Sequence, residues 1–90
     1  MTSEYHPVIQ TEMALIEKGA EAASAAMKAV QAKQSKLARE LLRNSRKLQR
    51  LASGLIKKRL ARQPHDDLDA QIDPLLSSTD SLIKEAQQNI

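Results

Sequence analysis

A row of apolar residues at alternating intervals of four and three positions constrains the fold of this chain more than any other feature. The row runs from residue 9 to residue 55 and has two polar members, Gln34 and Asn44. Its positions are Ile9, Met13, Ile16, Ala20, Ala23, Met27, Val30, Gln34, Leu37, Leu41, Asn44, Leu48, Leu51 and Leu55. Such spacing keeps its members on one side of a helix with about 3.5 residues per turn, as in helices that pack side by side. The sequence therefore predicts an all-α fold with coiled-coil-like packing.

Proline positions divide the chain into two predicted helical arms. Because a proline disfavours helical geometry in the residue before it, Pro64 ends a long helix predicted over about residues 8–62, and a linker follows over residues 63–66. The main alternative for this helix is a break at residues 44 and 45. A second apolar row predicts a second arm over about residues 67–89, with Leu68, Ile72, Leu75, Thr79, Leu82, Ala86 and Ile90 as its members. Pro74 leaves open a short helical turn that ends at Ile72, followed by a helix over residues 74–88.

The two predicted arms differ greatly in length. At about 1.5 Å per residue, the first is roughly 80 Å long and the second roughly 35 Å. We expect residues 1–7 to form a flexible tail and the two arms, over residues 8–90, to form a single helical-hairpin domain. In that hairpin the short arm reaches only about residues 34–60 of the long one. The seam over residues 9–30 would remain in water, which is unfavourable for a soluble monomer.

This uncovered half of the row is the predicted partner-binding seam. Its members are Ile9, Met13, Ile16, Ala20, Ala23, Met27 and Val30. Alanines crowd the same segment between residues 20 and 29, either because alanine favours helix or because small side chains let another helix approach closely. Gln34 and Asn44 either fix the register of buried helices or mark places where the row faces solvent. The sequence thus predicts oligomerisation or docking of a partner helix.

Charge follows an acidic–basic–acidic layout along the chain. Residues 28–62 carry twelve Lys and Arg against one acid, Glu40, whereas the segments before and after them are net acidic. Six of these bases form one stripe on the predicted long helix: Lys36, Arg39, Arg43, Arg46, Arg50 and Lys57. Their spacing is three or four residues, except for the last interval, which is seven residues. The stripe is either a solvated face partly paired with the acidic second arm, or a site for an acidic protein or for nucleic acid. Membrane binding is disfavoured because no Trp or Phe can anchor the helix.

Side chains that could carry out chemistry are sparse. The two histidines, His6 and His65, have no second metal ligand at helical spacing, and the aspartates after His65 lack the glycine and closing glutamate of a calcium loop. The chain has no cysteine and no apolar run of about 20 residues. We therefore expect no enzyme activity, no cofactor, no metal and no small-molecule substrate. A soluble protein, most simply an intracellular one, is expected.

Two classes of function follow from these features. The first is a protein-binding module: a small helical adaptor, assembly subunit or chaperone that binds a partner helix, or a second copy, through the predicted seam. The second is a nucleic-acid-binding helical dimer that uses the basic stripe. In general shape the expected hairpin resembles two-helix proteins that pair into four-helix bundles and bind RNA, and in size it is similar to small helical secretion chaperones.

Overall fold

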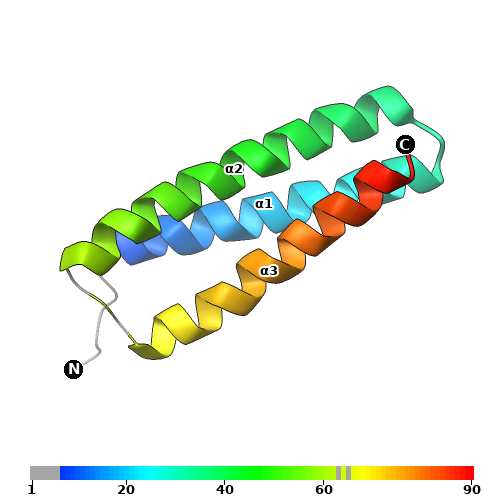
Figure 1. Ribbon diagram of the computed structural model, residues 1–90. Coiled ribbons are helices and arrows are strands. Elements are labelled where there is room, and N and C mark those ends of the chain that lie inside the picture. The colour runs from blue at the N-terminus through cyan, green and yellow to red at the C-terminus, as the bar shows by residue number, and fades with distance from the viewer. Residues whose placement is uncertain (1–6, 63, 65) are drawn as a thin grey trace.

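The computed structural model describes residues 7–62, 64 and 66–90, and within them the chain is a bundle of three helices. Helix α1 spans Pro7–Gln31, α2 spans Ser35–Arg62 and α3 spans Asp66–Gln88. In Figure 1, α1 and α3 run in the same direction and α2 runs back between their ends. The described residues contain no strand, so the all-α prediction is confirmed.

The predicted long helix over residues 8–62 is wrong. The chain reverses between α1 and α2, so the bundle measures 48 Å along its longest axis, whereas one continuous helix would need roughly 80 Å. The three helices have 25, 28 and 23 residues, which makes them nearly equal in length. The hairpin of unequal arms is therefore replaced by a bundle in which each helix has two neighbours.

The reversal uses a helix C-cap that normally contains glycine. Lys33 has a positive φ of 62°, its N–H donates to the Val30 carbonyl at 3.0 Å, and the N–H of Gln34 donates to the Ala29 carbonyl at 2.8 Å. These two bonds define a Schellman motif with Lys33 at the left-handed position. The Gln34 carbonyl then accepts the first bond of α2, from Ala38, at 2.9 Å. Gln34 is therefore an exposed cap and not a buried register residue.

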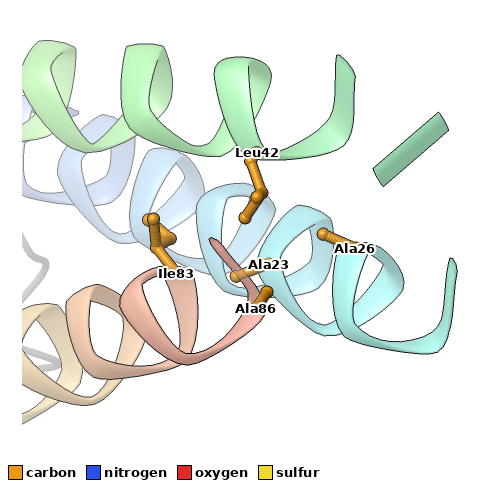
Figure 2. Close-up of a cluster of buried hydrophobic side chains, with 5 residues drawn as sticks. All are labelled: Ala23, Ala26, Leu42, Ile83 and Ala86. Carbon is orange, nitrogen blue, oxygen red and sulfur yellow. The ribbon is translucent and has the colours of Figure 1, made fainter. Parts of the chain in front are cut away.

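Small side chains line the buried face of α1. Ala22, Ala23, Ala26 and Ala29 are buried. Figure 2 shows two of them meeting Leu42 of α2 and the Ile83 and Ala86 side chains of α3. Gly19 lies close to α2, because a Cβ added to it would lie 3.6 Å from the Cβ of Leu48. Ser45 of α2 donates a hydrogen bond of 2.7 Å to the Gly19 carbonyl. The alanine segment is thus a close-packing surface, and its partners are helices of the same chain.

The buried row of α2 is displaced by about one residue from the predicted row, whereas α3 keeps several of its predicted positions. On α2 the protected positions are Ala38, Leu42, Ser45, Gln49, Ala52, Ile56 and Arg59, again spaced by four and three. All except Arg59 come directly after a predicted seam position, and Leu37 and Leu51 of the predicted row are 45% and 50% exposed. On α3 the predicted positions Ile72, Thr79 and Ala86 are buried, while Ile83 is buried in place of Leu82, which is only partly buried. Helix α2 therefore sits rotated relative to the prediction, because its close contact is made mainly by the small residues beside the leucines.

The second predicted arm is one helix. Helix α3 continues through Pro74, so the alternative with a separate turn before that proline is wrong. Its first residue is Asp66, which the prediction placed in the linker, while Gln63 and His65 lie outside the described residues. The predicted tail also lies outside them, except for Pro7, which begins α1 at a position where proline is favoured.

Candidate functional site

The predicted basic stripe lies entirely on α2. Arg46 is half-buried and the other five members, Lys36, Arg39, Arg43, Arg50 and Lys57, are exposed. Because each residue of a helix adds about 100° of rotation around the helix axis, neighbouring members of the stripe differ by less than about 90° around that axis and share one side of α2. The stripe runs along the flank of α2 that faces α3, because Arg46 Nη2 donates a hydrogen bond to Gln87 Oε1 of that helix.

Four arginines of the stripe line one groove. The groove has a volume of about 420 Å³ and is bordered by Arg39, Arg43, Arg46 and Arg50, by Leu42, by Gln87 near the end of α3 and by Ile90 beyond it. From the first to the last arginine the rise along α2 is about 16 Å. The four arginines therefore border the groove over about three helical turns.

These guanidinium groups are not neutralised within the described part of the chain. Arg39, Arg43 and Arg50 form no ion pair there, and the only cation of α2 that pairs with an acid of α3 is Arg59, which lies outside the stripe. The interpretation that the acidic arm masks the stripe thus finds no ion pair to support it among these residues. The charge is directed outward and is available to an anion.

Backbone electrostatics add to the positive potential at one end of the groove. The first turn of α2 contains no acidic residue but contains Lys36, although the N-terminal end of a helix dipole favours negative charge. Such an arrangement is unfavourable for the helix by a few tenths of a kcal/mol up to about 1 kcal/mol.

The predicted partner-binding seam is part of the bundle core. Ile9, Ile16 and Ala23 are buried, and Met13, Ala20, Met27 and Val30 are half-buried. Met13 and Met27 pack against clusters that include side chains of α2 and α3. The expectation that this half of the row lies in water is wrong, because the turn at residues 32–34 brings α2 back over it.

An ion-pair network that the sequence reasoning missed joins all three helices. Glu12 of α1 is fully buried and accepts hydrogen bonds from Arg59 Nε at 3.0 and 2.8 Å. Arg59 Nη2 also donates to Asp69 Oδ1 of α3 at 2.6 Å. The hydrogen bond to Glu12 raises the pKa of Arg59, and burial opposes that rise. In the sequence, the signal was that Glu12 lies three residues after Ile9 and four residues before Ile16, a spacing that places it on the same side of the helix as these two apolar residues.

Other kinds of site are not formed by the residues described. No group of three His, Cys, Asp or Glu side chains among them could hold a metal ion, and none of the described helices is long and apolar enough to cross a membrane. No protein-family model matches the sequence, and comparisons with curated proteins and with solved structures give no match.

Proposed function

We propose that this protein is a non-enzymatic binding protein that holds the phosphodiester backbone of a nucleic acid in the arginine groove of α2. The observation that carries the proposal is that four arginines of one helix line the same groove. Guanidinium groups bind phosphate oxygens through paired hydrogen bonds, and their charge does not depend on pH in the neutral range. A row of anions spaced along a strand fits a row of arginines better than a single small anion does.

Recognition by this groove would depend on charge and not on base sequence. The chain contains no Phe or Trp and one tyrosine, Tyr5, so aromatic stacking on bases contributes little. Contacts to phosphate position a nucleic acid without reading its sequence. We therefore expect the protein to bind nucleic acids of different base sequence with similar affinity, and we expect that affinity to fall steeply as the salt concentration rises.

Fluorescence anisotropy with labelled single-stranded oligonucleotides tests this proposal. Four arginine–phosphate pairs predict that the logarithm of the binding constant falls with the logarithm of the salt concentration with a slope of about −3. Reversing the charge at two positions of the groove, by Arg39→Glu together with Arg43→Glu, should weaken binding of the oligonucleotide by at least about tenfold. The same variant should flatten the slope by about 0.7 for each phosphate that an arginine no longer neutralises.

Lys28→Glu with Lys84→Glu is the matched control, because it makes the same change in net charge at two exposed positions of α1 and α3. It should change the affinity far less than the arginine variant does. Equal weakening in the two variants would mean that the net charge binds the oligonucleotide, and the groove would then have no special role. Competition by polyglutamate as effective as competition by the oligonucleotide would contradict the phosphodiester specificity.

A further inference from the structure

A row of leucines on α2 lies at the outer edge of the bundle core, and one of them, Leu41, packs against the core. It consists of Leu37, Leu41, Leu48, Leu51 and Leu55, with Asn44 in its middle. Leu37 and Leu51 are 45% and 50% exposed, and the other three leucines are half-buried. From the first leucine to the last, the row rises about 27 Å along α2, or five helical turns. The two exposed leucines, Leu37 and Leu51, lie about 21 Å apart along α2, and the outer sides of the half-buried leucines add a smaller apolar surface.

The row has a regular shape that suits another helix. Its members keep the four-and-three spacing of a coiled-coil seam, and one side of it adjoins α1, where Leu48 lies beside Gly19. The spacing is already satisfied on the inner side of α2 by the residues that pack in the bundle. A helix from outside the bundle can lay its apolar side along the exposed Leu37 and Leu51 and the outer sides of the half-buried leucines.

Charge along the open edge of the row specifies the kind of helix. Lys47 comes four residues before Leu51, and Lys58 comes seven residues after it, so both lie on the same side of α2 as that leucine. Both lysines are exposed, and neither forms an ion pair within the described residues. Arg62 lies seven residues beyond Leu55, while Glu40 is the one acid near this edge.

We infer that the leucine row of α2 is a docking surface for an amphipathic helix of another protein, with leucine-like residues on one side and glutamates or aspartates beside them. The acidic side chains face Lys47 and Lys58 when the apolar side covers Leu37 and Leu51. A second copy of this chain fits less well, because the flank of its own row offers a single acid, Glu40, to the two lysines Lys47 and Lys58. The surface is separate from the arginine groove, so this inference does not depend on the proposed nucleic-acid binding.

The experiment measures binding of two synthetic helical peptides to the full chain by fluorescence anisotropy. Both peptides carry a leucine seam of three heptads, and they differ only in having glutamate or lysine at the flanking positions. The acidic peptide should bind the protein about tenfold or more tightly than its lysine twin. Substituting Leu37→Ser and Leu51→Ser together should weaken the acidic peptide by about tenfold or more, since both side chains are already partly in water and the fold does not depend on them.

Leu75→Ser is the matched control, because this leucine of α3 is 43% exposed and lies outside the row. It should leave the affinity for the acidic peptide unchanged. Equal binding of both peptides, or equal weakening by Leu75→Ser, overturns the inference. So does equal weakening by Arg39→Glu with Arg43→Glu, because the peptide would then occupy the groove. If the unliganded protein forms a dimer that Leu51→Ser dissociates, the occupant is a second copy and the inference is wrong.

Discussion

Glu12, Arg59 and Asp69 place charge where a small bundle would ordinarily place apolar side chains. The side chains of Arg59 and Glu12 are 3% and 0% exposed, so both charges have lost most of their hydration. Hydrogen bonds between them offset this desolvation but need not exceed it. Their benefit is geometric, because only one register of the three helices brings the guanidinium group within reach of both carboxylates. We interpret the network as the feature that fixes how the helices align.

Removing one member should cost more than removing the pair. Arg59→Met leaves the Glu12 carboxylate buried without its partner, and we expect the free energy of unfolding to fall by about 3–5 kcal/mol. Adding Glu12→Leu should restore most of that stability, since a buried pair is often replaced by apolar residues at little cost. Urea denaturation of the three proteins tests this. A double variant no more stable than Arg59→Met would show that the pair is net stabilising.

The pH dependence of this network follows from the direction of the pKa shift. Folding raises the pKa of Arg59, chiefly through its hydrogen bond to Glu12. A raised pKa of a basic group contributes stability that is complete below the ordinary pKa of the group and is lost only above the raised one. The contribution of the Arg59 charge is therefore constant through the neutral range.

At the level of the helices, the turn between α1 and α2 decides the architecture. Its three residues, Ala32, Lys33 and Gln34, include no glycine or proline, and Lys33 takes a backbone conformation that costs a non-glycine residue about 1–2 kcal/mol. The turn is stabilised by its two capping hydrogen bonds and by the packing of α2 against α1. Local preference and tertiary packing thus oppose each other here, and packing determines the outcome.

Substituting Lys33→Gly separates the two architectures by the sign of its effect. In the bundle, glycine removes the left-handed penalty, so the free energy of unfolding should rise by about 0.5–1 kcal/mol. In a continuous helix the same change would lower stability by about 1 kcal/mol. Lys28→Gly, within α1, is the control and should be destabilising. Chemical denaturation measures both variants, and a destabilised Lys33→Gly protein would contradict the turn.

The helical class, the stop near Pro64 and the basic stripe could be predicted from the sequence, because periodicity and charge act locally. The turn could not, since the seam continues in register through Gln34 and its cap lacks the usual glycine. One sign was present: residues 31–36 contain no large apolar side chain. The rotation of α2 was also missed, because the residues at the contact are Ser45, Ala52 and Arg59, which look less like core than the neighbouring leucines.

For the whole molecule, α2 presents three different sides to its surroundings. Its inner side packs in the bundle, one flank carries the arginine groove beside α3, and the other carries the leucine row beside α1. Both outer surfaces exist because the chain covers the seam of α1 by itself. If α1 and α2 formed one straight helix, the leucines and the seam of α1 would form a single surface, and the division of roles proposed for α2 would disappear.

The most direct test of this arrangement is the distance between the start of α1 and the end of α2. The chain has no cysteine, so spin labels at Gln10→Cys and Lys58→Cys, both exposed positions, can be placed without side reactions. Pulsed electron paramagnetic resonance on labelled protein, diluted with unlabelled protein, then reports the distance between the two spin labels within one chain. The bundle predicts about 20–30 Å, from helix axes about 10 Å apart plus the labels. A separation near 70 Å, the length of 48 residues of continuous helix at about 1.5 Å each, would contradict it.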